Sequence, residues 1–177
     1  METPKIAAHR GDLTAEAADV LVNAANSSLL GGGGVDGALH AAAGPALLAA
    51  CRSVRAERWP DGLPVGEAVA TEAGDLPARW VVHTVGPNAA RGETDPGLLA
   101  SCFTRSLDVS AELGARSVAF PAVSAGVYAW PAEAVADIAV RAVRGWVAEH
   151  PDTSVQDVRF VLFGDALLAE FERALAG

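Results

Sequence analysis

The sequence predicts a three-layer α/β fold, with helices on both faces of a mixed but mostly parallel central sheet. Short apolar runs of strand length alternate along the chain with longer segments whose apolar residues recur every three or four positions. Strands that alternate with amphipathic helices form a parallel sheet that the helices cover. The chain has 177 residues, 51% of them hydrophobic, and shows no repeat or low-complexity linker. We therefore expect one compact domain over residues 1–177.

The first half of the chain is expected to supply four strands and one long helix. Runs such as Val20-Leu21-Val22 are typical of buried strands. The strands expected here are Lys5–His9, Asp19–Asn23, Glu67–Thr71 and Trp80–Val85. A helix is expected to start near Asp36, because apolar residues then recur at helical spacing. Its apolar face would consist of Leu39, Ala43, Leu47, Cys51 and Val54.

The second half is expected to contain three helices and two strands. The helix Leu98–Leu113 would be closed by Gly114 just past its last turn, and Pro131 suits the first position of the next helix. The expected strands are Ser117–Val123 and Val158–Phe163, and the last helix would bury Leu168, Phe171 and Leu175.

Composition excludes several classes of function. A net charge of −9 argues against general nucleic-acid binding, which needs many Lys and Arg residues to neutralise phosphates. We find no signal peptide and no apolar stretch of membrane-spanning length. Cys51 and Cys102 belong to no metal-binding or redox motif, so we expect buried, reduced thiols and no bound metal. These features favour a cytoplasmic protein.

The most informative segment is the four-glycine run 31–34, which lies between a predicted strand and a predicted helix. Glycines at such a place let the backbone approach a ligand closely. The alternative is a flexible surface loop without a ligand. A second turn, residues 121–128, also leaves a strand and enters a helix, although Gly126 there can simply permit a tight turn. No Lys or Arg occurs in residues 11–51 or 117–140. If these turns bind phosphate, backbone N–H groups and helix N-termini must hold it.

Two common nucleotide-binding motifs do not explain these glycines. No Lys follows them, as the GxxxxGK[ST] loop requires. The GxGxxG pattern matches Gly32, Gly34 and Gly37, but the first of these does not leave a strand directly. Glu57, at the distance where an acidic strand-end residue is needed, falls on a helix. A dinucleotide-dependent oxidoreductase is therefore disfavoured.

The motifs taken together resemble the macrodomain family, in particular the MacroD-type ADP-ribosyl hydrolases. The resemblance covers nearly the whole chain, and its most specific element is the interval from Asn26 to Asp36. It runs through Gly11-Asp12-Leu13-Thr14, Val22-Asn23-Ala24-Ala25-Asn26, Gly31 to His40, Val82-His83-Thr84-Val85-Gly86-Pro87, and Ala119-Phe120-Pro121 on to Tyr128.

The resemblance implies a role for each matching residue. Asp12 would accept a hydrogen bond from adenine, with the backbone of Leu13 beside it, although Asp12 also suits a buried or capping position. Tyr128 would close over the distal ribose and Phe163 would stack on adenine, although Phe163 suits the core equally. Ala24 and Pro121 would border the ligand. The diphosphate would be held, mostly by N–H groups, at Gly33, Gly34, Val35, Ser124, Ala125, Gly126 and Val127.

The same resemblance implies two catalytic residues. Asn26 would fix the distal ribose, and Asp36 would position or activate the attacking water. Such ester cleavage needs a carboxylate near the bond and a polar group that orients the sugar, and a well-placed water makes a metal unnecessary. We expect no cofactor. The alternative for Asp36 is a plain helix N-cap. We expect structural or supporting roles for His40 and burial for His83.

The sequence departs from the family at three places around Tyr128. Leu63-Pro64-Val65-Gly66 stands where many relatives carry Cys-x-Thr-Gly, Ala125 replaces a common Thr, and Ala129-Trp130 replaces Gly and an aromatic residue. The resemblance implies a hydrolase that removes ADP-ribose from acidic side chains of ADP-ribosylated proteins and whose site can also serve deacetylation of O-acetyl-ADP-ribose. The oligomeric state is open, although nothing in the sequence demands more than a monomer. The alternative is a reader module that binds ADP-ribose without turnover. Asp36 favours the enzyme, because readers without turnover often lack this aspartate.

Overall fold

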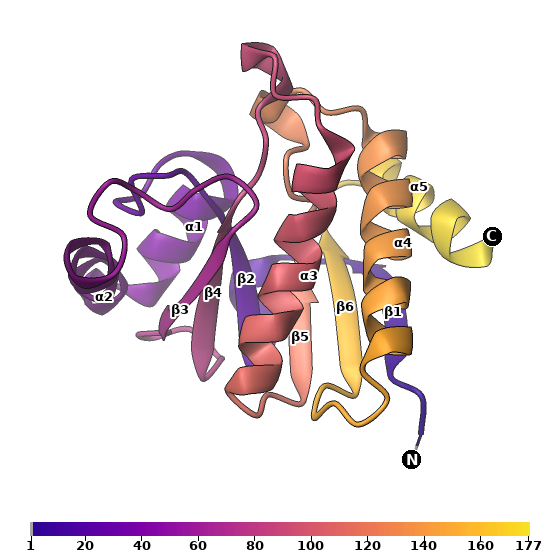
Figure 1. Ribbon diagram of the computed structural model, residues 1–177, viewed down its shortest axis with the longest axis horizontal. Helices are drawn as coiled ribbons and strands as arrows, with labels where there is room; N and C mark the ends of the chain where they lie inside the picture. Colours follow the sequence, from indigo (N-terminus) through magenta and orange to yellow (C-terminus); the bar gives the residue numbers. More distant parts are fainter. Residues whose placement is uncertain (1) are drawn as a thin grey trace.

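A six-stranded sheet forms the centre of the protein, as the computed structural model of residues 2–177 shows (Figure 1). Residue 1, included in the predicted domain, lies outside this description. The strand order is β1-β6-β5-β2-β4-β3, and only β3 runs antiparallel to its neighbour, β4. The strands are β1 (Lys5–Arg10), β2 (Val20–Ala25), β3 (Ala68–Glu72), β4 (Trp80–Val85), β5 (Ser117–Phe120) and β6 (Asp157–Leu162). The expected three-layer fold with a mostly parallel sheet is confirmed.

Within residues 2–177, five α-helices cover the two faces of this sheet. Successive side chains of a strand point to opposite faces, so Val20 and Val22 pack into one apolar cluster and Leu21 into the other. The first cluster contains apolar residues of α3 (Pro96–Glu112), α4 (Ala132–Glu149) and α5 (Asp165–Ala176). The second contains those of α1 (Gly34–Ala43) and α2 (Pro45–Glu57). Figure 1 shows α3 and α4 side by side in front of the strands.

The expected single helix beginning near Asp36 is wrong, because the chain forms α1 and α2 with a break at Gly44. Gly44 has φ 79° and ψ −176°, and its N–H donates to the carbonyl of His40, which ends α1. Pro45 starts α2; it has no N–H to continue a helix and disfavours helical backbone at the residue before it. Leu39 and Leu47 both stay in the second cluster, so the apolar spacing persists across the break.

Several predicted boundaries shift by a few residues for local reasons. β5 ends at Phe120 rather than Val123, because Pro121 cannot donate to a strand ladder. Pro131 precedes α4 as its N-cap instead of occupying the first turn. Gly114, with φ 75°, follows the end of α3 as expected. Both cysteines are buried and free, and within residues 2–177 no helix combines the length and apolar character needed to cross a membrane.

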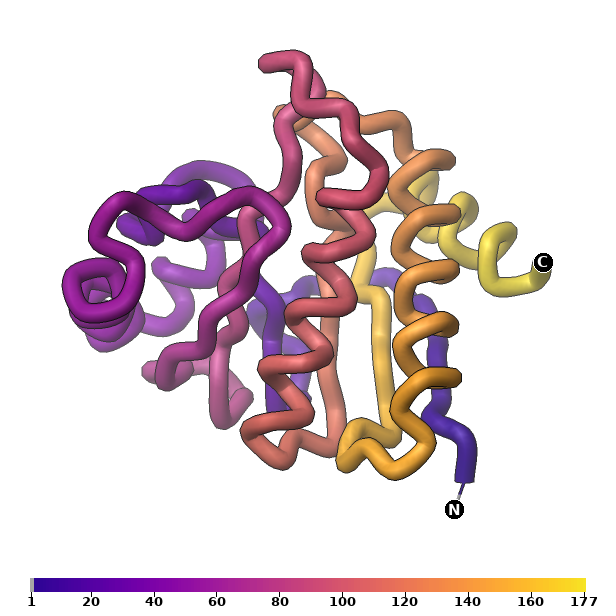
Figure 2. Tube along the Cα trace, viewed as in Figure 1, coloured from indigo at the N-terminus to yellow at the C-terminus, as the bar shows by residue number. Residues whose placement is uncertain are grey.

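The carboxyl ends of the parallel strands gather at one edge of the sheet. Figure 2 shows the chain after β4 rising at the top of the view, beside the segment that follows β5. The N-terminus lies at the opposite edge, where β1 begins. Ligands of α/β proteins settle beyond the carboxyl ends of strands, so this edge is where a site is expected.

Candidate functional site

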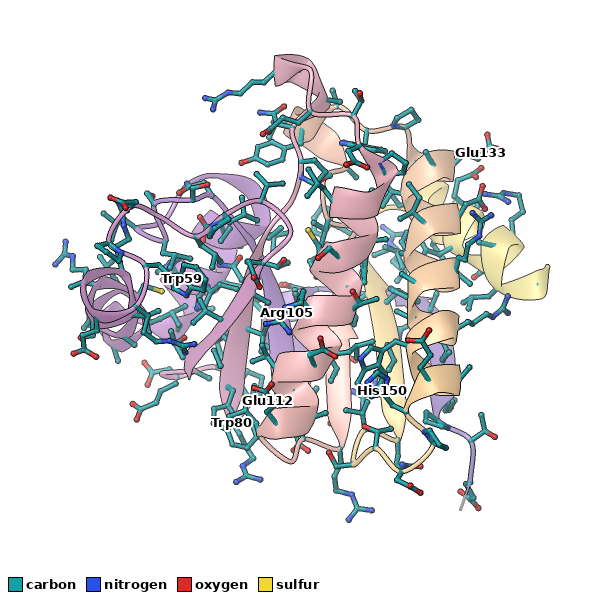
Figure 3. The ribbon with its side chains drawn as sticks, in the orientation of Figure 1. Trp59, Trp80, Arg105, Glu112, Glu133 and His150 are labelled. Atoms are coloured by element: carbon teal, nitrogen blue, oxygen red, sulfur yellow. The ribbon has the colours of Figure 1, made fainter. Side chains whose placement is uncertain are left out.

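A cleft of about 790 Å³ opens at the carboxyl ends of the parallel strands. Its walls come from the segments after β1, β2, β5 and β6 and from the start of α1. Every residue for which the sequence predicted a binding or catalytic role lines it. Trp80, Glu112 and His150, which Figure 3 labels, lie at the opposite end of the sheet from this cleft. The structure thus brings the predicted residues together, while their individual roles stay predictions.

A second hollow, of about 410 Å³, lies at the amino ends of the strands, beside Asp19 and Arg79. The carboxylate of Asp19 already accepts a hydrogen bond from the N–H of Arg116, 2.8 Å away. The guanidinium of Arg79 lies over the ring of Trp80. Because these groups have partners within the fold, the large cleft is the candidate site.

The glycine run forms one wall of the cleft and leads into α1. Gly33 is the N-cap of α1 and no side chain caps the helix. The first N–H groups of a helix have no partner inside it, and they favour anions. A Cβ placed on Gly33 or Gly34 would meet nothing within 4 Å, and Gly34 has φ +59°. This wall therefore presents accessible backbone at the N-terminus of α1 to a ligand.

The turn after β5 forms the facing wall. Gly126 has φ +73°, and a Cβ there would also meet nothing within 4 Å. Ser124 is buried with φ 69°, and its hydroxyl donates to the carbonyl of Pro87 over 2.8 Å. A Cβ on Gly86 would overlap that hydroxyl. Ser124 thus fixes the turn with its side chain and has only backbone to offer the cleft.

The lining of the cleft contains no Lys or Arg, and its only charged side chains are Asp12 and Asp36. Within residues 2–177 no group of three or more His, Cys, Asp or Glu side chains is arranged to hold a metal ion. An anion entering this cleft would meet N–H groups and glycine backbone instead of cationic side chains.

Asp12 is exposed and acts as a cap in this structure. One of its carboxylate oxygens, Oδ1, accepts hydrogen bonds from the Thr14 N–H at 2.9 Å and the Thr14 hydroxyl at 2.7 Å. It caps the short 3₁₀ helix Leu13–Ala15. Because Oδ2 takes no part in these bonds, the capping role leaves one oxygen for a ligand.

Asp36 is the third residue of α1 and only 4% exposed. The Asn23 side-chain amide donates to Asp36 Oδ1 over 2.8 Å, and His40 Nε2 lies 3.4 Å from the same oxygen. Asp36 Oδ2 has no hydrogen-bond partner and is buried. The N-cap alternative for Asp36 is wrong, since Gly33 occupies that position. A carboxylate with one oxygen anchored and the other free is suited to act on a small polar group.

Asn26 and Asp36 converge on Gly32. Asn26 Nδ2 donates to the Gly31 carbonyl over 3.0 Å, and Asn26 Oδ1 accepts from the Ser28 N–H at 3.0 Å and also from the Ser28 hydroxyl. A Cβ on Gly32 would lie 3.1 Å from Asn26 Nδ2 and 3.1 Å from Asp36 Oδ2. The amide and the carboxylate therefore flank a position where even a methyl group would force them to shift.

Behind Asp36 lies a buried polar chain that the sequence did not predict. Asn23 Nδ2 also bonds His83 Nδ1 at 3.1 Å, and His83 Nε2 contacts the Thr71 hydroxyl at 2.9 Å and Cys51 Sγ at 3.6 Å. The expected burial of His83 is confirmed. Burial, and next the charge of His40, lower the pKa of His83 from its ordinary value to about 3. A polar Asn inside the apolar run of β2 was the signal that could have drawn attention to this chain.

Phe163 is 84% exposed at the rim, directly after β6, so the alternative that it belongs to the core is wrong. Val127 is 89% exposed on the facing turn, whereas Tyr128 is half-buried. Phe163 thus lines the cleft with an exposed side chain, and its stacking on adenine stays a prediction.

The chain belongs to the macro domain family. Its sequence matches the family model of the Macro domain over residues 22–139. It is 56% identical over 174 residues to a macro domain-containing protein of Streptomyces griseus, covering 98% of this chain and 96% of the relative. The family resemblance noted in the sequence is confirmed.

Other relatives and solved structures carry names that state an activity or a ligand. A Cronobacter sakazakii relative named O-acetyl-ADP-ribose deacetylase is 49% identical over 167 residues, covering 94% of this chain and 91% of the relative. The Oceanobacillus iheyensis macrodomain with ADP superimposes with a TM-score of 0.88 at 39% identity, covering 96% of this chain and 88% of that chain. The Trypanosoma brucei macrodomain in complex with ADP-ribose superimposes with a TM-score of 0.87 at 37% identity. The match covers 96% of this chain and 68% of that chain.

Proposed function

We propose that this protein binds ADP-ribose in the large cleft and hydrolyses an ester at the distal ribose. Its substrates are mono-ADP-ribose linked to acidic side chains of proteins and O-acetyl-ADP-ribose. The observation that carries the proposal is the pair Asn26 and Asp36, which converge on Gly32 with one carboxylate oxygen of Asp36 left free. The deacetylase name of the Cronobacter sakazakii relative and the ADP-ribose complex of the Trypanosoma brucei macrodomain support it.

The diphosphate lies between the two glycine-rich walls in this proposal. The open backbone at Gly33, Gly34 and Gly126 leaves room for phosphate oxygens to approach. N–H groups at the start of α1, aided by the helix dipole, supply hydrogen bonds and partial positive charge. The lack of any Lys or Arg in the lining makes this backbone contribution necessary.

The two ends of the ligand are distinguished by the remaining side chains. Asp12 Oδ2 and the exposed ring of Phe163 receive the adenine, as a hydrogen-bond acceptor and a stacking surface. Asn26 Nδ2 has a second hydrogen besides the one donated to Gly31, and this hydrogen is available to a hydroxyl of the distal ribose. Tyr128 closes the cleft over that sugar.

The reaction adds water across the ester. Asp36 Oδ2 accepts a proton from the water, whose oxygen bonds to the acyl carbon while the bond between that carbon and the ribose oxygen breaks. The ribose oxygen takes the proton, so the products are a carboxylic acid and a free ribose hydroxyl. Asp36 Oδ2 is buried, and it would lie 3.1 Å from a Cβ on Gly32. In this proposal water reaches it when the glycine run moves, and glycines permit that movement.

The residues given a role in the proposal all line one cleft, and the proposed reaction uses no cofactor. We also propose that the enzyme is a single-domain, monomeric, cytoplasmic protein, in line with the expectations from the sequence. A reader module that binds ADP-ribose without turnover is the second candidate, favoured by the buried position of Asp36 Oδ2.

The test is incubation with a mono-ADP-ribosylated protein whose ADP-ribose is carboxylate-linked, followed by detection of free ADP-ribose. Parallel incubation with O-acetyl-ADP-ribose, followed by detection of acetate, examines the smaller ester. Release in either assay supports the enzyme. Tight binding of ADP-ribose with release in neither assay would leave only the reader.

A further inference from the structure

We propose that His83 and Thr71 are positioning residues that keep the side-chain amide of Asn23 turned with its nitrogen toward Asp36. The inference rests on the proposed function, in which Asp36 acts on water. Neither His83 nor Thr71 lines the cleft, and His83 does not touch Asp36 in the hydrogen-bond chain. Their effect on catalysis therefore passes through Asn23.

The chain is built by the register of three neighbouring strands. Asn23 on β2 pairs with His83 on β4, and Val81 of β4 pairs with Thr71 of β3. The side chains of Asn23, His83 and Thr71 are all buried. Polar side chains in an apolar interior are costly unless each finds a hydrogen-bond partner. The chain gives each of these side chains at least one partner and ends at the carboxylate of Asp36. Both bonds of Asn23 use its nitrogen, and its buried oxygen Oδ1 has no partner.

The direction of each hydrogen bond follows from the groups that can only accept. The ionised carboxylate of Asp36 only accepts, so Asn23 must offer its nitrogen there. At the other end, the Thr71 hydroxyl donates to the Glu72 carbonyl over 3.0 Å and is left as an acceptor. His83 therefore donates through Nε2–H to Thr71, which leaves Nδ1 without a hydrogen to accept from Asn23.

Thr71 thus controls which ring nitrogen of His83 carries the hydrogen. If Nδ1 carried the hydrogen, it would face the amide nitrogen of Asn23, and two donors would oppose each other. Asn23 would then turn over and place its oxygen against Asp36 Oδ1, where two acceptors repel. A neutral ring with hydrogen on Nε2 avoids both conflicts. The pKa of His83, lowered to about 3 first by burial and next by the charge of His40, keeps the ring neutral.

Cys51 also lies against the ring of His83. Its Sγ lies 3.6 Å from His83 Nε2. Burial, followed by the negative charge of Asp36, raises the pKa of the Cys51 thiol to about 12, so it stays protonated. A neutral thiol accepts hydrogen bonds only weakly, and Thr71 therefore remains the acceptor that fixes the tautomer.

The first arm of the test compares threonine variants in hydrolysis of a carboxylate-linked ADP-ribosylated protein. Thr71→Val keeps the shape and removes the acceptor, so we expect kcat to fall about tenfold or more because a slightly misplaced carboxylate is inefficient. The Kd for ADP-ribose should stay within about threefold, since Asn23, His83 and Thr71 do not line the cleft. Thr71→Ser, which keeps the hydroxyl, should restore kcat.

Thr84→Val is the matched control. Thr84 is a buried threonine on β4 whose hydroxyl donates to the Glu67 carbonyl over 2.8 Å, outside the chain to Asp36. It should lose stability as Thr71→Val does and keep kcat within about twofold. Equal losses of kcat in both valine variants, or unchanged kcat in Thr71→Val, would overturn the inference. The proposed function is tested separately: it stands if the wild-type protein hydrolyses the substrate and the Asp36→Ala variant does not.

The second arm does not depend on activity. Imidazole ¹⁵N spectra of the wild-type protein should show His83 as the neutral Nε2–H tautomer from pH 5 to pH 8. The chain has only four histidines, and His83→Asn assigns the signal. Thr71→Val should give a mixture of tautomers. A wild-type His83 with hydrogen on Nδ1, or one that becomes charged within this range, would refute the inference even if the protein proved to be a reader.

Discussion

Gly32→Ala tests the convergence of Asn26 and Asp36 with a single methyl group. The added Cβ would lie 3.1 Å from Asn26 Nδ2 and 3.1 Å from Asp36 Oδ2, closer than ordinary van der Waals contact. Both groups must then move by a few tenths of an ångström. Gly32 has no positive φ, so alanine adds no backbone strain, and the smaller freedom of the unfolded chain contributes about 0.4–1 kcal/mol of stability. The fold should therefore be retained.

Turnover should respond much more than stability. Displacing an acid–base group by a fraction of an ångström is expected to lower kcat by about 10-fold to 100-fold, or about 1.4–2.8 kcal/mol of barrier. The assay is single-turnover release of ADP-ribose from a carboxylate-linked substrate, with thermal unfolding measured alongside. Gly145→Ala is the control: an exposed glycine of α4 whose Cβ would meet nothing within 4 Å, it should gain stability and keep kcat. Full activity in a folded Gly32→Ala protein would refute the claim that turnover depends on the positions of Asn26 and Asp36 beside Gly32.

Three other predictions concern the ligand and the walls of the cleft. ADP-ribose should bind with a micromolar Kd, about −8 kcal/mol, and raise the melting temperature; calorimetry without heat at millimolar ligand would contradict this. EDTA should leave turnover unchanged, and loss of activity that added metal restores would overturn a metal-free reaction. Gly34→Val and Gly126→Glu should abolish binding in a folded protein, because a side chain then occupies the position of phosphate oxygens. Gly92→Glu, at φ +83° with open space around it but outside the cleft, carries the same strain as Gly126→Glu and should keep binding.

The fold was predictable because its signals are local. β4 was predicted with the bounds that it has, since its apolar run ends in a glycine and a proline. The break between α1 and α2 was missed because apolar spacing continues across it, although Gly44-Pro45 is a stop and start signal. Local sequence thus determined which elements form, and the exact ends depended on backbone hydrogen bonds.

The site was predictable only in part. The first glycine turn, Asn26 and Asp36 could be found because they adjoin one another in one family-like motif, and the second glycine turn could be found because it also joins a strand to a helix. The chain through Asn23, His83 and Thr71 depends on which strands pair and in which register, and no single segment carries that information. The exposure of Phe163 likewise depended on β6 ending at Leu162.

The most direct test of the proposed activity compares the wild-type protein with Asp36→Ala on a protein bearing carboxylate-linked ADP-ribose. Affinity for free ADP-ribose is measured for both. The wild-type protein should release ADP-ribose, and Asp36→Ala should release it at least about 100-fold more slowly while its Kd stays within about tenfold. Wild-type protein that binds ADP-ribose and releases none, or an Asp36→Ala protein with unchanged turnover, would contradict the assignment of Asp36 as the group that acts on water.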